Sequence, residues 1–565
     1  MVADGLTFLH TENTTVCIAD PLRGYAVFMS CWTTFRWALV AAMSAVAVVV
    51  SGAEAPDSKA DSGKDRPATV GHHERLDDPP AAIDRDRGLP KSTGFTVVEH
   101  QGFWSYQVNV DAEGRNIPDD AANEPSIAVD PLNPDRMAIG WRQFDDRSSN
   151  FRQAGWGWSD DRGRSWTFPN VLTPGIFRSD PVLDVDADGR FYYYSLKNSL
   201  LCDFFFSDNQ GRTWSGPVPA FGGDKQWFTI DRTDGPGRGN IYASWALVSN
   251  PWGERVFIRS TNGGQTFSDP IVLRPAPTWG TLTVAPDGGL YLAGNSSYNT
   301  RIFVLYRSLD ARSSGGNPTF DAFGFSLGGD QDSGQAPNPG GLTGQVWIAA
   351  NHSDGPDRGD LYIVSSVDPA GRDPQDVHFI RSKDRGETWT QPKRINTDDR
   401  DAWQWFATMS AAPNGRIDVV WVESVSEDEP NIGALTYAFS EDGGDTWSVP
   451  VTVSPTFNSW RGWPRQNKLG DYYDMVSDDT GANLAWAATF NDEQDVYFTR
   501  LWADCNGNGA SDSYDVWLGQ ERDLNENLDP DSCEIAEDPG LDTDGDGILD
   551  EFQTAPRSGG GRVTP

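Results

Sequence analysis

The sequence predicts an all-β fold built from repeated antiparallel units, and three observations lead to that prediction. The 565 residues include 58 Gly and 37 Pro, slightly above ordinary usage, which suits a chain with many turns. Short runs rich in aromatic and β-branched residues alternate with turn residues through the middle of the chain. One turn pattern recurs there in five good copies. With 38% hydrophobic residues, including 23 Trp and 28 Phe, the chain can form a large core.

Residues 1–55 contain a segment that is expected to direct export. Residues 37–50 form a short apolar run, preceded by Arg36 and followed by Ala53-Glu54-Ala55. This arrangement is typical of a secretory signal that is cleaved near Ala55, with Met29 as the expected true start; a single membrane anchor is the alternative. Residues 56–94 carry Pro and many charges without periodicity and are expected to be a flexible linker. We therefore predict a secreted or cell-surface protein.

The repeated turn pattern lies within residues 95–503 and reads Ser-x-Asp/Asn-x-Gly-x-Ser/Thr-Trp/Phe. Its five good copies begin at Ser159, Ser207, Ser260, Ser382 and Ser440, and a degraded copy begins at Ser308. The Asp or Asn can accept backbone N–H bonds, the Gly can adopt a positive φ, and the aromatic ring can pack beneath the turn. Each copy follows an aromatic-rich strand, so the pattern predicts β-hairpin turns rather than catalytic groups.

This pattern is the Asp box, or BNR repeat, and residues 95–503 resemble the sialidase-type β-propeller family. Blade number can also be argued from the spacing of the strands. A two-strand unit precedes each turn, and a seventh unit at residues 473–490 has a third strand but no such turn. Seven units in this region leave about 58 residues each, which suits a four-stranded blade. We predict seven blades; six blades with one irregular unit, closer to the sialidase plan, is the alternative.

The last predicted unit lacks an outer strand, whereas an extra β-like segment precedes the first unit. This segment lies at residues 95–98 or 106–110. Pairing it with the last unit would close the ring and remove two exposed strand edges.

Residues 504–552 carry a patterned negative charge. From 504 to 551 there are 16 acidic residues and one basic residue, and three sets of oxygen-bearing side chains follow the spacing of calcium loops. The predicted calcium ligands are Asp504, Asn506, Asn508, Asp512, Asp515, Asp523, Asn525, Asn527, Asp529, Asp531, Glu534, Asp542, Asp544, Asp546 and Asp550. The tail resembles thrombospondin type 3 or dockerin-like calcium repeats, because seven residues between loops cannot hold the flanking helices of an ordinary EF-hand pair. A solvated acidic tail is the alternative, and residues 553–565 are expected to be disordered.

The cysteines and one further acidic cluster have simpler interpretations. Cys505 and Cys533 share the acidic tail and can form a disulfide in an oxidising compartment, whereas Cys202 is expected to be a buried, inert thiol. Asp184, Asp186 and Asp188 share the opening spacing of a calcium loop. They lie inside a predicted β-hairpin, so we interpret them as turn residues.

The family resemblance implies a glycosidase site with an arginine cluster that clamps a substrate carboxylate, a tyrosine nucleophile activated by a glutamate, and an aspartate acid/base. A planar guanidinium matches a carboxylate with two hydrogen bonds, and a neutral phenol does not repel an anionic sugar. The chain departs from the family because no Phe-Arg-Ile-Pro motif is present near the first unit, where Asn123-Glu124-Pro125 stands instead. The arginine clamp therefore cannot be transferred residue by residue.

Polar or aromatic residues stand at the start of nearly every predicted inner strand, where equivalent positions should surround one mouth of the propeller. These residues are Glu124, Asp180, Asp224, Gln226, Trp227, Trp279, Gln345, Trp403, Gln404, Asp471, Tyr472, Tyr473 and Asp474. The candidate catalytic residues are Glu124, Asp180, Tyr472, Tyr473, Arg142, Arg178 and Arg465. A purely structural role, in which these groups satisfy strand ends, is the alternative.

The formal charge of −37 argues against a nucleic-acid partner, because binding phosphates requires a basic face. Neither H-E-x-x-H nor C-x-x-C occurs in the sequence, which disfavours a zinc site. Two functions remain. The first is an extracellular glycoside hydrolase of the sialidase type that acts on glycans or glycoproteins. The second is a non-catalytic propeller that binds glycans or proteins, with the calcium tail as a spacer or docking module for a protein partner.

Overall fold

A computed structural model describes residues 96–553 except 297–298, 503, 507, 509–510 and 526–529, together with the backbone of a short strand pair near the N-terminus. The chain divides into two compact units, residues 1–68 and 69–565. In the first unit, β1 (Leu9–Thr11) pairs antiparallel with β2 (Thr14–Val16). The predicted export signal and linker lie outside the described residues. In the part of the chain that the structure describes, no helix is long and apolar enough to cross a membrane.

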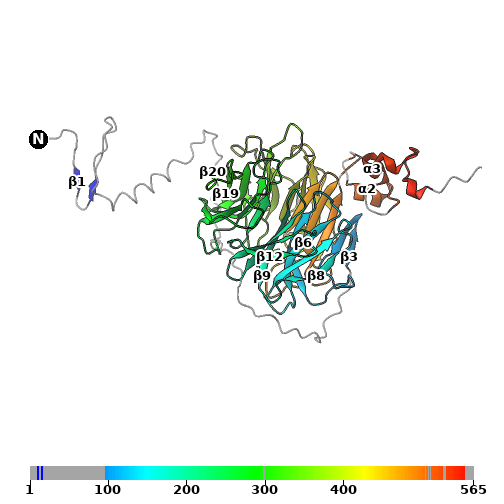
Figure 1. Ribbon diagram of the computed structural model, residues 1–565, viewed down its shortest axis with the longest axis horizontal. Helices are drawn as coiled ribbons and strands as arrows, with labels where there is room; N and C mark the ends of the chain where they lie inside the picture. Colours follow the sequence, from blue (N-terminus) through cyan, green and yellow to red (C-terminus); the bar gives the residue numbers. More distant parts are fainter. Residues whose placement is uncertain are drawn as a thin grey trace, which may run out of the picture. The chain divides into compact units, whose positions relative to one another are not determined.

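The second unit is a seven-bladed β-propeller, as predicted (Figure 1). In each of the first six blades the innermost of four antiparallel strands comes first in the chain. Blades 1 to 3 consist of β5 (Ala121–Val129), β6 (Met137–Phe144), β7 (Gln153–Ser159) and β8 (Thr167–Leu172); β9 (Arg178–Val185), β10 (Phe191–Lys197), β11 (Cys202–Ser207) and β12 (Ser215–Pro219); and β13 (Trp227–Ile230), β14 (Ile241–Ser244), β15 (Arg255–Ser260) and β16 (Ile271–Val272).

Blades 4 to 6 follow the same order, and blades 5 and 6 each have an additional two-residue strand. They consist of β17 (Pro277–Val284), β18 (Leu290–Ser296), β19 (Asn299–Ser308) and β20 (Asp321–Phe325); β22 (Trp347–Ala350), β23 (Leu361–Pro369), β24 (Asp376–Ser382) and β25 (Lys393–Arg394), with β21 (Gly329–Asp330); and β26 (Gln404–Ala411), β27 (Ile417–Ser424), β28 (Ile432–Ser440) and β29 (Val451–Thr452), with β30 (Phe457–Asn458).

Blade 7 closes the ring with strands from both ends of the propeller sequence. Its inner strands are β31 (Asp474–Asp478), β32 (Gly481–Ala488) and β33 (Asp495–Trp502), and its outer strands are β4 (Phe103–Gln107) and β3 (Val97–His100). Tyr106 pairs with Phe498, so the blue N-terminal strands lie beside the orange ones (Figure 1). The predicted closure is therefore confirmed, and both β-like segments contribute to it. Continuous pairing leaves the ring without an open strand edge at this junction.

The repeated turns have the geometry that the pattern predicts. In the first copy, Asp161 accepts a hydrogen bond from the backbone N–H of Ser165 at 3.0 Å, and Ser159 Oγ accepts one from Gly163 N at 3.0 Å. Gly163 has φ of +80°, and Trp166 is buried against Phe498 of the neighbouring blade. The turns thus fix the hairpins and pack one blade against the next.

Side chains of the inner strands, and in blade 5 of the second strand β23, also link neighbouring blades, in a set of contacts that we call the inner-strand belt. Each bond runs from a backbone N–H of one blade to a side-chain oxygen of the preceding blade. The six pairs are Ile127 to Asp474 (3.1 Å), Leu183 to Ser126 (2.8 Å), Ile230 to Asp184 (3.2 Å), Ile348 to Thr281 (3.0 Å), Ala407 to Ser366 (3.0 Å) and Ser477 to Ser410 (2.9 Å). The belt satisfies edge N–H groups that would otherwise be buried without partners.

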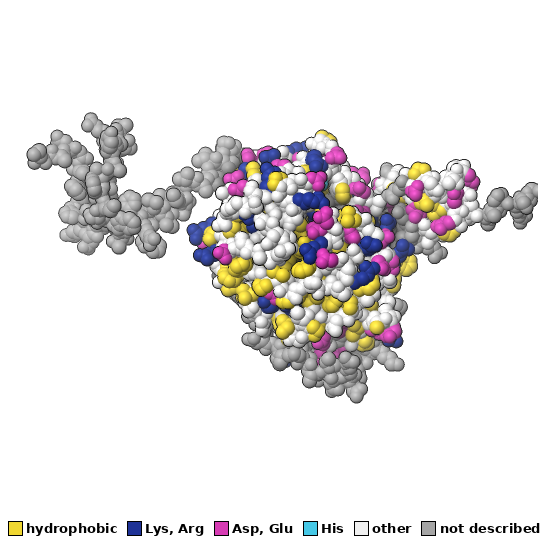
Figure 2. Space-filling view, viewed as in Figure 1, with side chains coloured by type: hydrophobic (Ala, Val, Ile, Leu, Met, Phe, Trp, Pro, Cys, Tyr) yellow, Lys and Arg dark blue, Asp and Glu magenta, His cyan; other side chains and the backbone are white. Residues whose placement is uncertain are grey.

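The acidic tail contains α2 (Asp512–Leu518), α3 (Asp531–Glu537) and two 3₁₀ turns, η1 (Pro539–Leu541) and η2 (Asp550–Phe552). Short helices fit despite the seven-residue spacing between loops, because three of them begin inside predicted calcium loops. α2, α3 and η2 all start at the ninth position of their loop. Cys505 and Cys533 form the predicted disulfide, and Cys202 is a buried free thiol, as expected. On the propeller face shown in Figure 2, acidic and basic side chains are interspersed.

Candidate functional site

The starts of the inner strands surround the propeller axis at one level, which we call the mouth. The inner-strand belt shows which residues hold equivalent positions in different blades. In several blades, the residue three positions before the bonded N–H lies at the start of the inner strand. Stepping back from Ile127, Leu183, Ile230 and Ile348 gives Glu124, Asp180, Trp227 and Gln345, respectively. As predicted from the sequence, the first residues of these strands therefore share one region.

Backbone strain marks several mouth positions. Glu124 and Asp180 have φ of +50° and +46°, and Trp279 and Phe406 in blades 4 and 6 have φ of +52° and +58°. Each lies where the pairing of an inner strand shifts register, as in a β-bulge. Positive φ in a non-glycine residue costs about 1–3 kcal/mol and is concentrated at functional sites. The bulges redirect these side chains from the sheet surface.

Glu124 is fully buried and contacts two cationic side chains. Its Oε2 lies 3.1 Å from Nε of Arg142, and its Oε1 accepts a hydrogen bond from Nζ of Lys468 at 3.2 Å. Arg142 also donates to Asn123 Oδ1 at 2.8 Å. Burial raises the pKa of Glu124 to about 8, although both cations oppose that shift. The carboxyl group is therefore held largely protonated at neutral pH.

Asp471 connects both buried lysines. Its Oδ2 lies 2.6 Å from Nζ of Lys225 and accepts a hydrogen bond from Nζ of Lys468 at 2.6 Å. Its Oδ1 accepts the backbone N–H of Leu342 at 2.9 Å. Burial alone would raise the pKa of Asp471, but Lys225 and Lys468 hold it well below the usual range. Asp471 is therefore ionised.

Lys225 also contacts the two acidic groups of blades 2 and 3. Its Nζ donates to Asp180 Oδ2 at 2.9 Å and lies 3.4 Å from Asp224 Oδ1. Against the effect of burial, Lys225 and Arg142 lower the pKa of Asp180, whereas burial raises the pKa of Asp224 to about 7. Two carboxyl groups in one site thus have pKa values shifted in opposite directions, the pattern expected of an acid and a base.

Two further arginines lie near the mouth in different environments. Arg152 is fully buried, donates to Ser179 Oγ at 3.1 Å and lies over the ring of Phe177. Burial lowers the pKa of Arg152 to about 10. Arg178 is held in a separate pair, since it donates to Asp203 Oδ2 at 2.9 Å.

We call Glu124, Arg142, Arg152, Asp180, Asp224, Lys225, Lys468 and Asp471 the charged centre. All eight side chains are buried. Burial raises the pKa of Glu124 to about 8 and that of Asp224 to about 7, which favours the neutral form of both acids, and it also lowers the pKa of Lys468. Asp180 and Asp471, whose pKa values are lowered, are the ionised carboxylates that face the cationic side chains. The charged centre therefore has an excess of positive charge and can accept an anionic group.

The two candidate tyrosines, Tyr472 and Tyr473, directly follow Asp471 of the charged centre in the chain. Tyr472 donates its hydroxyl to the carbonyl oxygen of Pro181 at 2.8 Å, and Tyr473 donates to that of Ala487 at 2.7 Å. Burial raises the pKa of both phenols well above 10. As placed, both hydroxyls bond to backbone carbonyl oxygens.

Tyr472 also belongs to an aromatic plug on the axis. Its ring lies 5.3 Å from that of Trp227, which lies 5.2 Å from that of Trp347. Both tryptophans also line a cavity of about 710 Å³ that continues along the later residues of the inner strands, including Ile230, Val284 and Met475. The plug therefore lies between the mouth and this axial cavity.

Two loops, residues 331–344 and 459–471, hold Asp471 in place; we call them the interlocked loops. Asn338 is fully buried and joins them, because its amide donates to Gly470 O at 2.8 Å while its carbonyl accepts Leu469 N at 2.9 Å. Gly340 N adds a bond to Asn467 O at 2.7 Å. Arg465, on the second loop, is exposed and does not belong to the charged centre.

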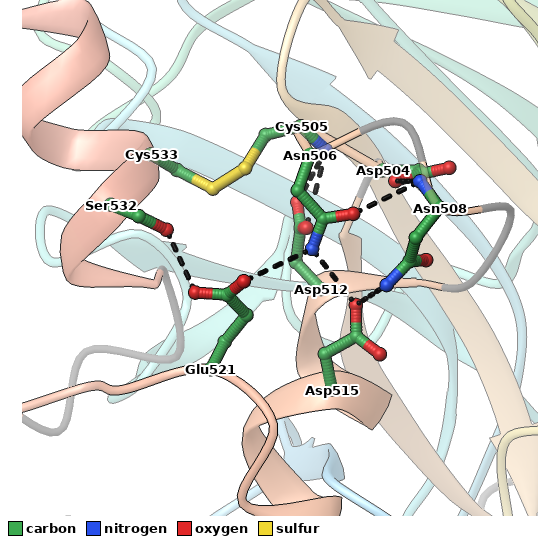
Figure 3. Close-up of a disulfide and its surroundings, with 9 residues drawn as sticks. All are labelled: Asp504, Cys505, Asn506, Asn508, Asp512, Asp515, Glu521, Ser532 and Cys533. Carbon is green, nitrogen blue, oxygen red and sulfur yellow. Dashed lines mark hydrogen bonds between the residues drawn. A yellow bond between two sulfur atoms is a disulfide. The ribbon is translucent and has the colours of Figure 1, made fainter.

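The tail brings several predicted calcium ligands together (Figure 3). Asn506 and Asn508 both donate to Asp515 Oδ2, at 3.2 and 2.7 Å, and Asp504 accepts the backbone N–H of Asn508 at 3.0 Å. Asp512 instead accepts the backbone N–H of Cys505.

The second and third loops are partly described. Asn525 donates to Glu534 at 2.9 Å in the second loop, while Asn527 and Asp529 lie outside the described residues. In the third loop, Asp542, Asp544 and Asp550 each place a carboxylate oxygen within 4.8 Å of the others.

Sequence reasoning and the structure agree only in part on the charged centre. The structure brings together Glu124, Arg142, Asp180, Asp224 and Asp471, and places Arg178 and Arg465 elsewhere. Lys225, Lys468 and Arg152 were missed. Lys225 could have been predicted from the sequence, because it adjoins Asp224 at a predicted strand start. No local pattern distinguishes Lys468 or Arg152 from surface residues.

Comparison with known proteins shows no family for this chain. No family model matches the sequence, and no curated protein matches it. Among solved structures, the phage phi92 endosialidase is 10% identical over 71% of this chain and 69% of its own, with a TM-score of 0.42. The Trypanosoma rangeli sialidase is 12% identical, covering 73% of this chain and 58% of its own (TM-score 0.36). The Aleuria aurantia lectin is 12% identical, covering 59% and 96% (TM-score 0.35).

Proposed function

We propose that this protein is a glycoside hydrolase that acts on glycans ending in a carboxylated sugar, as a sialidase does. The observation that carries the proposal is the charged centre, in which buried cations outnumber ionised carboxylates at the mouth of the propeller. An excess of buried positive charge is costly unless an anion neutralises it. Arg142 and Arg152 supply guanidinium groups that suit a carboxylate.

The two classes of carboxyl group supply the chemistry. Glu124, held protonated by its burial, can donate a proton to the glycosidic oxygen as the bond to the anomeric carbon breaks. Asp180, held ionised by Lys225, can stabilise the positive charge that develops on the sugar. A water molecule then bonds to the anomeric carbon and gives a proton to the Glu124 carboxylate, which restores the acid. Because every group of the centre is buried, substrate entry requires the interlocked loops to separate at Asn338.

The test is hydrolysis of a fluorogenic sialoside, compared with a panel of neutral aryl glycosides. We expect selective release from the sialoside and at least a hundredfold loss in Glu124→Gln, in line with the usual contribution of a general acid. Glu427→Gln is the matched control, because Glu427 is exposed in a loop of blade 6. Release from a neutral glycoside alone, or full activity in Glu124→Gln, would contradict the proposal.

Binding without hydrolysis is the second candidate, and the tyrosines favour it. The hydroxyls of Tyr472 and Tyr473 are both engaged by backbone carbonyls, which leaves neither in position to act as the nucleophile of a sialidase. A lectin-like propeller needs only the cationic centre. Binding of a sialylated glycan on an array without release from any aryl glycoside would support this alternative.

For the tail, we propose that the three loops bind calcium and that the ions give it a fixed form for a protein partner. Support comes from the convergence of Asp504, Asn506, Asn508 and Asp515, oxygen-bearing side chains that suit this cation. Calorimetric titration of the chelated protein with calcium tests the idea. We expect Asp515→Asn and Asp544→Asn each to lower the stoichiometry, while a titration without heat would refute the assignment.

A further inference from the structure

The mouth has two chemically different sides. The charged groups belong to blades 1, 2, 3 and 7, whereas the mouth positions of blades 4, 5 and 6 are Trp279, Gln345 and Phe406. In a ring of seven blades, blade 5 lies across the axis from blades 1 and 2. The strand start that carries Gln345 therefore lies across the axis from those of Glu124 and Asp180.

Gln345 has an unusual environment for an amide. It is 1% exposed, and within the described part of the chain neither its Nε2 nor its Oε1 has a hydrogen-bond partner. An unsatisfied buried polar atom typically costs about 1–3 kcal/mol. Both the donor and the acceptor of one side chain are affected, so the cost applies twice.

The backbone holds Gln345 firmly in this position. The adjacent Val346 donates to the carbonyl oxygen of Trp279 at 2.8 Å, and Thr343 accepts the N–H of Phe406 at 2.6 Å. Two residues further along the same strand, Trp347 contacts Trp227 in the aromatic plug. These backbone bonds fix the start of the strand on which Gln345 lies, two residues before Trp347 of the plug.

We propose that Gln345 is the centre of a neutral subsite that binds hydroxyl groups of the ligand whose carboxylate enters the charged centre. The inference rests on the proposed function and identifies how the uncharged part of the ligand is held. An amide offers one donor and one acceptor group, which match a sugar hydroxyl acting as acceptor and donor. Trp279 beside it supplies an apolar face for the carbon skeleton of the ring.

Gln404 of blade 6 extends the same side of the mouth, whereas Gln226 of blade 3 lies beside the charged centre and donates to the backbone carbonyl of Asp180. The Oε1 atoms of both are buried and lack a hydrogen-bond partner among the residues that the structure describes. In the ring, blade 6 is next to blade 5, whereas blade 4 separates blade 3 from blade 5. Gln345 and Gln404, in neighbouring blades, therefore both leave hydrogen-bonding capacity unfilled on this side of the mouth, as expected of a site that is completed by a polar, uncharged group.

The experiment compares two acids by calorimetry on the full chain: N-acetylneuraminic acid, which carries many hydroxyls, and pyruvate, which carries none. We expect Gln345→Leu to weaken binding of the sugar acid by about tenfold, the equivalent of about one to two hydrogen bonds, and to leave pyruvate binding unchanged. Binding of both acids with unchanged affinities in Gln345→Leu would overturn the subsite alone. No binding of either acid by the natural protein would overturn the charged centre as an anion site, and the subsite with it.

A stability measurement separates a ligand-binding role from a structural one. Gln494 is the matched control, because it is equally buried but its amide is fully paired, with Asn123 at 2.6 Å and Lys468 O at 2.8 Å. Without ligand, we expect Gln345→Leu to unfold at the same denaturant concentration as the natural protein or higher, and Gln494→Leu at a lower one. A destabilised Gln345→Leu would show that the amide serves the fold and would overturn the proposal.

Discussion

Lys225 and Asp471 form an ion pair of 2.6 Å across the propeller axis, although they belong to blades 3 and 7 and lie in different loops of the chain. The oxygen of Asp471 that contacts Lys225 also accepts a hydrogen bond from Lys468. Both lysines are buried, so this single oxygen compensates two desolvated charges. The pair therefore joins distant parts of the ring and sets the charge of the mouth at the same time.

Replacing Asp471 with Asn should strongly destabilise the protein. The amide keeps the shape and an acceptor for Leu342, but leaves Lys225 and Lys468 without their shared negative charge. Breaking a buried ion pair from one side typically costs about 3–5 kcal/mol. Urea denaturation measures the loss. Asp428→Asn, at an exposed position in blade 6, is the control and should leave the midpoint unchanged.

Glu124 should make stability depend on pH in a predictable direction. Its pKa is raised to about 8 by burial, so between its ordinary pKa near 4.5 and pH 8 the folded state holds a proton that the unfolded state has lost. Stability from this group is therefore complete below pH 4.5 and falls as the pH rises toward 8. In Glu124→Gln, denaturation curves from pH 5 to 8 should lose part of this decline; a variant with the slope of the natural protein would contradict the assignment.

Asn338 should control the opening of the interlocked loops. Asn338→Ala removes the bonds to Gly470 O and Leu469 N that join residues 331–344 to residues 459–471. We expect faster amide hydrogen exchange in both loops and little change in the blades, because the remaining backbone pairing is untouched. Exchange followed by mass spectrometry measures this. Asn414→Ala, in an exposed turn of blade 6, should leave both loops protected.

The architecture was predictable from the sequence because it depends on local signals. Each repeated turn fixes a hairpin within a few residues, and the β-like segments before the first unit indicated the closure with the last one, which the structure makes by pairing Tyr106 with Phe498. The charged centre was predictable only where a residue stands at a strand start, as Glu124 and Asp180 do. Lys468 was missed because its burial arises from contacts with Glu124 and Asp471 made by the fold of a long loop. Such contacts leave no periodic trace in the sequence.

The inner-strand belt should contribute measurably to stability. Thr281 Oγ1 accepts Ile348 N at 3.0 Å and donates to Val346 O at 3.1 Å, so Thr281→Val leaves a buried N–H and a carbonyl without this partner. We expect a loss of about 1–3 kcal/mol by denaturant unfolding. Thr281→Ser keeps the hydroxyl and should recover most of it. Thr283→Val, on the same strand but less buried, should cost much less.

The disulfide should stabilise the tail. Cys505 and Cys533 are 28 residues apart, and closing a loop of this length stabilises a folded segment by about 3–4 kcal/mol in the chain-entropy model. The Cys505→Ala/Cys533→Ala variant should therefore be cleaved in the tail by a protease at lower concentration than the natural protein. Cleavage at equal concentrations would show that the loops hold together without the bond. Cys202→Ala is the control for general loss of a cysteine.

The aromatic plug limits how a ligand can move along the propeller axis. Trp227, Trp347 and Tyr472 meet between the mouth and the axial cavity, and all three rings are nearly inaccessible to solvent. A molecule that reaches the charged centre cannot continue along the axis. In the proposed function, where substrate enters between the interlocked loops, the product must leave through the same opening, so product release and entry of the next substrate compete.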